Sequence, residues 1–326
     1  AGVTRVGQGA FWGCSRLTGI ELPAEVTSIG PSAFYQCSGL EKIVVDPENK
    51  TYNSNGDCNA IIETATNTLI WGCKNTRIPT DVIKIGSGAF SNCSGLTNIE
   101  IPASVTEIGS GAFSNCSRLI NIEIPASVTK IESGAFNNCG GLEKIVVNSG
   151  NKTYNSNGNC NAIIETATNK LIRGCKNSTI PVGVTRIDGY AFYGCKSLTS
   201  IEIPVGVTEI GWVAFYGCSS LTSIKIPAGV TLIESGTFEG CSSLKSVELP
   251  EGIRGFGADA FSGCSSLTDI KIPAGVKAIG EGVFADCSSL TSIELPDGVT
   301  DIYWHAFEGC SGLKSISISS SVTNII

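Results

Sequence analysis

A cysteine-marked period of 23 residues constrains this chain more than any other feature of its sequence. The cysteines from Cys195 to Cys310 recur every 23 residues, as do those from Cys93 to Cys139 and the pair Cys14 and Cys37. A fixed period in the twenties is typical of stacked structural units, each of which contacts mainly its neighbours. We therefore expect a solenoid, and the functional question becomes which of its faces binds a partner.

Each repeat follows the pattern C-x-x-L-x-x-I-x-I-P-x-x-V-x-x-I-G-x-x-A-F-x-x. In one copy, the alternation within Leu221–Ile226 predicts a short strand, and Pro227 ends it because proline cannot donate to a strand ladder. Residues 230–233 form a second short extended run. In A-F-x-x-C the Phe and the Cys are three residues apart, so one helical or 3-10 turn would place both inside.

These patterns predict a β-rich α/β solenoid of about 13 rungs, with short parallel strands joined by short helical turns. We expect residues 1–326 to form one such solenoid. Because the chain begins and ends within the repeat pattern, we interpret it as a piece of a longer array.

Two inserts interrupt the period, at about residues 46–77 and 148–179. They are near copies that lie 102 residues apart, which indicates duplication of a larger unit. In each, two apolar runs flank the turn sequence TATN, a pattern that predicts a β-hairpin. If Glu63 faces Thr68, then Ile62 faces Leu69.

The same hairpin register places Ala60 opposite Trp71 and Cys58 opposite Cys73, and the second copy places Cys160 opposite Cys175. A disulfide in each insert is one expectation, since a surface protein permits disulfides. Two buried thiols in each insert are the alternative.

The composition argues against several classes of partner. Charged residues make up 16% of the chain and the net charge is −7, whereas nucleic acids and anionic membrane surfaces select basic proteins. No apolar run approaches the ~20 residues that span a bilayer, and the sequence shows no signal peptide. We expect neither nucleic-acid binding nor membrane insertion by this segment.

The repeat resembles the BspA-like leucine-rich repeat, a variant typical of surface proteins of anaerobic and host-associated bacteria and of some mucosal protozoa. Eleven A/T/V-F-x-x-C signatures carry the resemblance, at Phe11, Phe34, Phe90, Phe113, Phe136, Phe192, Phe215, Phe238, Phe261, Phe284 and Phe307. The CNAIIETATNTLI-type segment of the inserts is similar to segments in such proteins. The resemblance implies a curved solenoid, display on a cell surface, adhesion to host or neighbouring-cell proteins, and no cofactor.

The cysteine column is the most conspicuous candidate for chemistry. A metal site needs several ligands that converge, whereas each repeat supplies one Cys and the chain has one His, His305. A small apolar filler on the inside of a turn is the simpler interpretation. We expect free buried thiols in the column, no metal site and, because no catalytic motif is present, no enzyme activity.

One candidate binding surface is the outward position between the two Ile residues of the strand. Opposite charges that neighbour each other on parallel strands attract, so this column predicts pairing between repeats. A solvated ladder and a charge-matched docking face both remain open. The members with alternating sign are Glu202, Lys225, Glu248, Lys271 and Glu294.

The second candidate is a group of aromatic residues beside the A-F turns of two adjacent repeats: Tyr190, Tyr193, Trp212 and Tyr216. Most repeats have Ser or Gly in the turn before A-F, and Ser, Asn or Glu after the Phe. Exposed clustered aromatics mark interaction sites and also suit sugar stacking. Coverage of the turn edge, or packing on the second hairpin, is the alternative.

We interpret the chain as an extracellular, non-enzymatic protein-binding module, a cell-surface adhesin for host or neighbouring-cell proteins. Two alternatives remain. One is a structural subunit that self-associates into a filament or scaffold, and the other is a carbohydrate-binding module that uses the aromatic residues.

Overall fold

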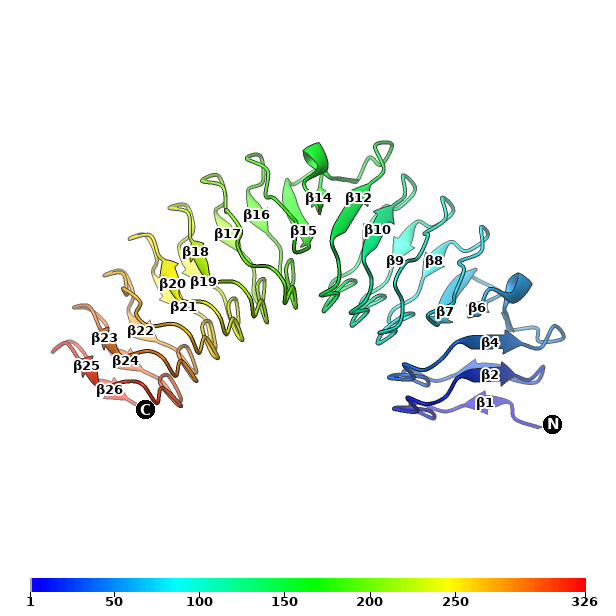
Figure 1. Cartoon of the computed structure of the whole chain (residues 1–326), viewed down its shortest axis with the longest axis horizontal. Coiled ribbons are helices and arrows are strands. Elements are labelled where there is room, and N and C mark those ends of the chain that lie inside the picture. Colours follow the sequence, from blue (N-terminus) through cyan, green and yellow to red (C-terminus); the bar gives the residue numbers. More distant parts are fainter. Residues whose placement is uncertain (1) are drawn as a thin grey trace. The chain divides into compact units, whose positions relative to one another are not determined.

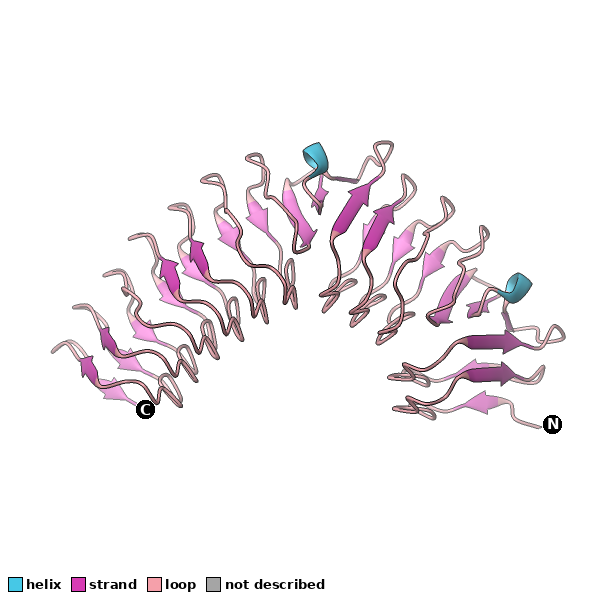
Figure 2. Ribbon diagram, in the orientation of Figure 1, coloured by secondary structure: helices cyan, strands magenta, loops and turns pink. Residues whose placement is uncertain are grey.

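The computed structural model describes residues 2–326, which separate into two compact units, Ala1–Asn155 and Ser156–Ile326. In each unit the chain winds coil after coil, and short strands of successive coils stack side by side (Figure 1). Helix in the described residues is confined to two 3-10 turns, η1 (Asn55–Asp57) and η2 (Asn157–Asn159) (Figure 2). The predicted leucine-rich-repeat solenoid is confirmed; its continuity across both units stays a prediction.

Each coil supplies up to two short strands, which pair in parallel with the corresponding strands of the neighbouring coils. We call the two resulting rows of strands the first and the second strand face. The first face comes from the I-x-I segment, and the second comes from the V-x-x-I segment. Partners are 23 residues apart, as in Ser223 with Ser246, because one repeat makes one turn of the solenoid. The predicted parallel strands are thereby confirmed.

In unit 1 the first strand face contains β2 (Gly19–Leu22) paired with β4 (Lys42–Val45), and β10 (Asn121–Ile124) paired with β12 (Lys144–Val147). The second strand face contains β1 (Arg5–Val6), β3 (Ser28–Ile29), β8 (Lys84–Ile85), β9 (Glu107–Ile108) and β11 (Lys130–Ile131). The first insert adds β5 (Tyr52–Asn53), β6 (Ala60–Glu63) and β7 (Thr68–Gly72), and β13 (Tyr154–Asn155) ends the unit.

In unit 2 the first strand face contains β18 (Ser223–Lys225) paired with β20 (Ser246–Glu248), and β23 (Ser292–Glu294) paired with β25 (Ser315–Ser317). The second contains β16 (Arg186–Ile187), β17 (Glu209–Ile210), β19 (Leu232–Ile233), β21 (Gly255–Phe256), β22 (Ala278–Ile279), β24 (Asp301–Ile302) and β26 (Asn324–Ile325). The second insert adds β14 (Ala162–Glu165) and β15 (Lys170–Gly174).

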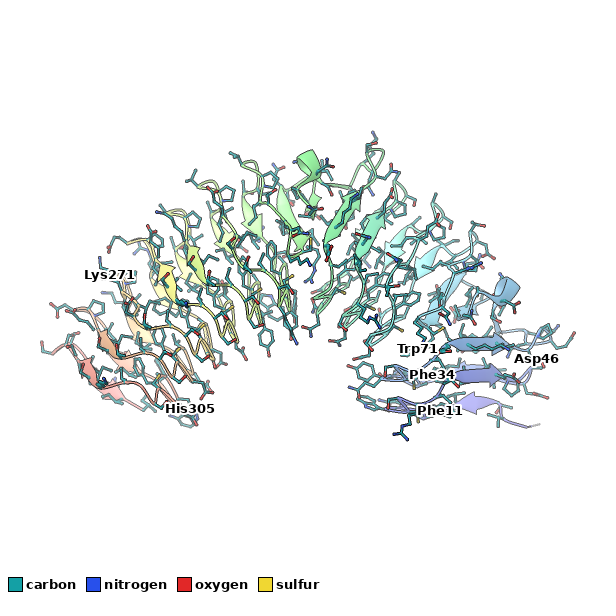
Figure 3. All side chains as sticks on the ribbon, in the orientation of Figure 1. Phe11, Phe34, Asp46, Trp71, Lys271 and His305 are labelled. Carbon is teal, nitrogen blue, oxygen red and sulfur yellow. The ribbon has the colours of Figure 1, made fainter. Side chains whose placement is uncertain are left out.

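A column of stacked phenylalanines runs through the core of each unit. In unit 2 the ring of Phe215 lies between Phe192 and Phe238, with centroids 5.0 and 5.5 Å away and nearly parallel planes. In unit 1, Phe11, Phe34 and Trp71 continue one column (Figure 3). The insert leaves room for the next ring through Gly72, because a Cβ there would overlap Phe90.

The A-F-x-x-C segment places Phe and Cys inside as predicted, but the predicted helical turn is absent. Residues two before and two after the Phe have positive φ, as Gly236 (60°) and Gly240 (71°) do around Phe238. This alternation points the backbone amides of Gly236, Phe238 and Gly240 along the stack, where they donate to carbonyls of the next coil. A helix would direct the same amides back along its own chain, so bonding between coils replaces it.

The expected free thiols in the cysteine column are confirmed, and most of them are buried. Their role includes a hydrogen bond that the sequence pattern did not suggest. Cys218 Sγ, for example, donates to the carbonyl of Phe192 at 3.3 Å, and burial raises the pKa of Cys241 to about 12. These thiols satisfy carbonyls inside the core and are poor nucleophiles. Cys14 is the exposed member of the column.

Both inserts form the predicted hairpin around TATN. Glu63 pairs with Thr68 and Ile62 with Leu69, as expected. The second hairpin strand then pairs in parallel with the next coil, so that Leu69 lies beside Ile85. Each insert therefore takes the place of one coil in the second strand face.

A β-bulge changes the rest of the hairpin register. It lies between Ile61 and Ile62, so Ala60 pairs with Gly72 and the expected pairing of Ala60 with Trp71 is wrong. One strand carries an extra residue at a bulge, and simple alternation gives no sign of it. The second insert has the same bulge.

The bulge also removes the register that placed Cys58 opposite Cys73 and Cys160 opposite Cys175. All four are free and buried in the structure, and Cys73 Sγ donates to the Asn59 carbonyl at 3.6 Å. Burial raises the pKa of Cys58 to about 11. A disulfide within each pair stays a prediction.

Candidate binding surfaces

The aromatic patch, defined as Tyr190, Tyr193, Trp212 and Tyr216, lies on the turn edge of unit 2, the side formed by the A-F-x-x-C turns. The Trp212 ring meets Tyr190 edge-on at 4.5 Å, and Tyr193 stacks on Tyr216 at 4.6 Å with planes 6° apart. Tyr190 and Tyr193 are 5.4 Å apart. The expected clustering is therefore present, and Trp212 remains 52% exposed.

The repeat geometry explains this clustering. Phe192 and Phe215 face inward one coil apart, with ring centroids 5.0 Å from each other. The residues that directly follow these two Phe therefore face outward about the same distance apart. Tyr193 and Tyr216 each follow their Phe directly, and their rings stack for this reason. A second pair at matching positions in unit 1, Trp12 and Tyr35, has centroids 4.6 Å apart.

The ring arrangement influences which ligand the patch suits. Tyr193 and Tyr216 each cover one face of the other, which reduces the open ring face that a stacked ligand could use. Burial, followed by the neighbouring Tyr216 and Tyr190, raises the pKa of Tyr193. Sugar rings stack on open aromatic faces, whereas rigid amphipathic edges are typical of protein interfaces.

The patch is built on strained backbone. At the position two residues before the Phe, which most coils fill with Gly, the patch has Tyr190 (φ 63°) and Val213 (φ 46°). A left-handed residue with a Cβ costs about 1–2 kcal/mol, and a β-branched residue there is a true outlier. The stacked coils impose a positive φ at this position, as at Ser32, Asp259 and His305, and the patch differs from them by having bulky or β-branched residues there.

A buried arginine supports the patch from inside. Arg173 is 3% exposed, and its Nη1 donates to the carbonyls of Tyr190 and Tyr193 at 3.0 and 3.2 Å. The near-identical first insert has Trp71 at this position. This difference between the two copies was the signal that sequence reasoning missed.

The predicted charge pairing between neighbouring residues of the outward column on the first strand face forms only in part. Lys225 pairs with Glu248 at 2.5 Å, as the sign alternation predicted. Lys271 instead pairs with Glu251 of the Pro-containing turn at 2.7 Å. Among residues 2–326, neither Glu202 nor Glu294 forms an ion pair.

Two open grooves adjoin this strand face in unit 2. One of about 520 Å³ is lined by Glu251, Asp269, Lys271 and Glu294 among others. Another of about 560 Å³ contains Glu202 and the exposed side chains of Val182 and Val205. In Figure 3 Lys271 lies away from the turn edge, which His305 marks. The strand-face and aromatic candidates are thus separate surfaces.

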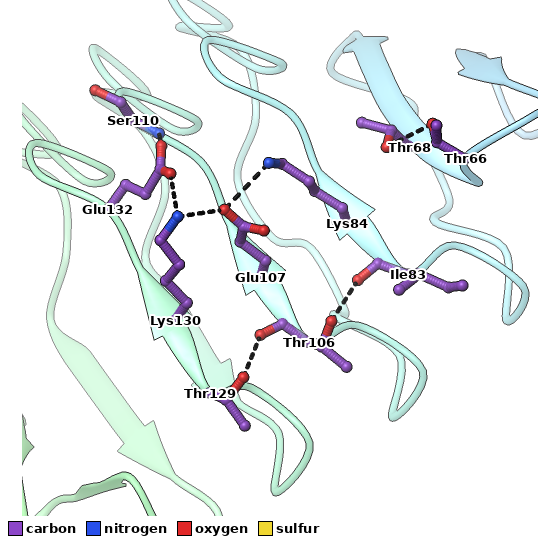
Figure 4. A network of polar contacts seen from close by, with 10 residues as sticks. All are labelled: Thr66, Thr68, Ile83, Lys84, Thr106, Glu107, Ser110, Thr129, Lys130 and Glu132. Carbon is purple, nitrogen blue, oxygen red and sulfur yellow. Dashed lines mark hydrogen bonds and ion pairs between the residues drawn. The ribbon is translucent and has the colours of Figure 1, made fainter.

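A stronger charge network lies on the second strand face of unit 1 (Figure 4). Glu107 contacts Lys84 at 3.1 Å and Lys130 at 2.8 Å, and Lys130 also contacts Glu132 at 2.6 Å. Hydrogen bonds from Lys130 and Lys84 lower the pKa of Glu107 to about 2. Sequence reasoning missed this ladder, although the 23-residue alternation of Lys84, Glu107 and Lys130 was visible.

Two kinds of feature are absent from the described residues. No group of three or more His, Cys, Asp or Glu side chains between residues 2 and 326 is placed to hold a metal ion. In the same range, no helix has the length and hydrophobicity of a membrane span.

Comparison with known proteins agrees with this geometry. The family model described as "BspA type Leucine rich repeat region (6 copies)" matches residues 1–58, 67–171, 163–287 and 212–326. No curated protein matches the chain significantly.

Solved structures extend the likeness. A leucine-rich repeat protein of Eubacterium ventriosum is 28% identical with a TM-score of 0.72, covering 100% of this chain and 79% of its own. A leucine rich cell surface protein of Faecalibacterium prausnitzii is 26% identical with a TM-score of 0.57, covering 98% and 84%. The pneumococcal vaccine antigen PcpA, 21% identical with a TM-score of 0.59, covers 99% and 84% and supports the fold alone. The chain therefore belongs to the family of BspA-type leucine-rich repeat proteins.

Proposed function

We propose that this chain is a non-enzymatic binding module, displayed at a cell surface or outside the cell, which holds host or neighbouring-cell proteins. The observation that carries the proposal is the aromatic patch, in which four aromatic side chains of two adjacent coils cluster on the turn edge of unit 2. Membership of a family with cell-surface relatives supports the location.

A stacked solenoid suits this role. Hydrogen bonds from one turn to the next fix the turn edge before a partner arrives, as Phe192 N to Ala214 O at 2.7 Å and Gly194 N to Tyr216 O at 2.7 Å show. A preformed surface loses little conformational entropy on binding. Trp and Tyr on such a surface supply the anchors that dominate interface energies.

The experiment is a binding screen with the purified chain immobilised. It is challenged with fibronectin, fibrinogen, collagen and a glycan panel, beside the variant Trp212→Ala/Tyr216→Ala. Trp304→Ala is the matched control, because Trp304 stands at the same repeat position as Trp212 and is 60% exposed.

Saturable protein binding that falls tenfold or more in the double variant, but not in the control, is the expected result. Binding that survives the double variant would move the site to another face. Glycan binding lost in the variant would favour a carbohydrate-binding module. No binding, with particles that grow as concentration rises, would replace the proposal by a self-assembling scaffold.

A further inference from the structure

The turn edge of unit 2 is acidic beyond the aromatic patch. From four residues before each Phe to five after it, its six coils contain seven acidic residues and one basic residue, Lys196. The acidic residues are Asp188, Glu234, Glu239, Asp259, Glu281, Asp286 and Glu308. Over the Phe90, Phe113 and Phe136 coils of unit 1, the same positions contain one acidic and one basic residue.

Most of this charge is uncompensated. Asp188 pairs with Lys170, and Glu308 contacts His305. In the described part of the chain the other five acidic residues form no ion pair. Like charges on neighbouring strands or turns repel, so these unpaired carboxylates do not stabilise the solenoid.

Two of these unpaired carboxylates belong to the coils that follow the patch. Glu239 occupies the position of Tyr216 one coil further along, and Asp259 belongs to the coil after that. Both are half-buried, and burial together with the nearby Asp259 carboxylate raises the pKa of Glu239. An apolar anchor site and an uncompensated negative site are therefore adjacent on one edge.

Resting on the proposed function, we infer that the turn edge of unit 2 binds a polypeptide segment in which basic residues lie close to an apolar anchor. The anchor occupies the aromatic patch, and Lys or Arg side chains lie over Glu239 and Asp259. Coils stack about 5 Å apart, so these carboxylates lie roughly 5–10 Å beyond Tyr216. That span corresponds to about two to three residues of extended chain.

The probe is a phage library of random 12-residue peptides, selected on the full chain and counter-selected on Trp212→Ala/Tyr216→Ala. Affinity of a synthetic consensus peptide is then measured on four proteins. They are the wild type, the patch variant Trp212→Ala/Tyr216→Ala, the charge-reversal variant Glu239→Lys/Asp259→Lys, and a control. The control, Glu100→Lys/Glu123→Lys, makes the same change in net charge at exposed positions of unit 1. Glu239→Gln/Asp259→Asn serves as a milder variant if the reversal impairs folding.

The expected consensus has Lys or Arg two to three residues away from an aromatic or aliphatic residue, on one side of it. Binding should weaken about tenfold in Glu239→Lys/Asp259→Lys, since two favourable contacts become repulsive, and stay unchanged in the control. Peptides that need Trp212 and Tyr216 but ignore the two carboxylates would overturn this inference and leave the proposed function intact. Failure to select any peptide that depends on the patch would count against both.

Discussion

Val213 offers a direct test of the strain in the aromatic patch. Its φ of 46° places a β-branched residue in the left-handed region, at a cost of about 1–2 kcal/mol. Asn tolerates this region and Ala does not. Val213→Asn and Val213→Ala both remove the isopropyl group, but only the first relaxes the backbone.

The two variants separate strain from packing. Val213 is half-buried, so losing its packing costs about 1 kcal/mol in either variant. Relief of strain offsets this loss in Val213→Asn, which should match the wild type. Val213→Ala should be about 1 kcal/mol less stable than Val213→Asn.

The assay is equilibrium unfolding in urea, with the midpoint and the slope both fitted because repeat arrays can depart from two-state behaviour. The same pair of substitutions at Val205, which is 87% exposed and has an ordinary φ, is the control and should show little difference. Equal stability of Val213→Asn and Val213→Ala, or a more stable Ala variant, would refute the strain argument.

Three further predictions follow from the core, the thiols and the charge network. Phe215→Ala should destabilise unit 2 by about 3–5 kcal/mol, since Phe215 is fully buried between two stacked rings. An unfolding free energy in urea that differs from the wild type by less than about 0.5 kcal/mol would contradict the stacking account. Without reductant, Ellman titration should detect Cys14 in the native chain and all 15 cysteines in denaturant, whereas 11 in denaturant would show both insert disulfides. Glu107, whose pKa is lowered to about 2, should stabilise unit 1 above pH ~4.5 and lose this effect as pH falls towards 2. Glu107→Gln should flatten the dependence of unfolding free energy on pH in that range. An unchanged dependence would contradict the lowered pKa of Glu107.

The repeating positions were predictable because each makes the same contact in every coil. A Leu, Ile, Phe or Cys at a 23-residue spacing has to face inward if the coils are to bury a common core, and Phe215 and Cys218 do so. The hairpin near TATN was predictable for a similar reason, since a four-residue loop fixes the pairing of Glu63 with Thr68.

Features that depend on one extra residue or on a choice between partners were not predictable. The bulge beside Ile61 shifts the pairing of Cys58 and Cys73 without altering the alternation of apolar residues. Lys271 has carboxylates within reach on two elements, and it pairs with Glu251 of the turn rather than with the strand column. The left-handed turns replace a helix because bonding to the next coil is a property of the stack, which a single repeat does not display.

The candidate patch combined both situations. Tyr193 and Tyr216 could be placed together from the period alone, because equal offsets from Phe192 and Phe215 must lie one coil apart. Tyr190 and Trp212 differ in offset by one residue, and their place in the turns of two adjacent coils put them in the same group. The strain at Tyr190 and Val213 and the support from Arg173 required coordinates, since both arise from backbone angles and from contacts of the second insert.

The most direct test of the central claim is the affinity of a partner protein found in the screen, measured for the wild type, Trp212→Ala and Trp304→Ala. If the aromatic patch is the binding surface, Trp212→Ala weakens binding tenfold or more and Trp304→Ala leaves it unchanged. Equal affinity of Trp212→Ala and the wild type would contradict the account.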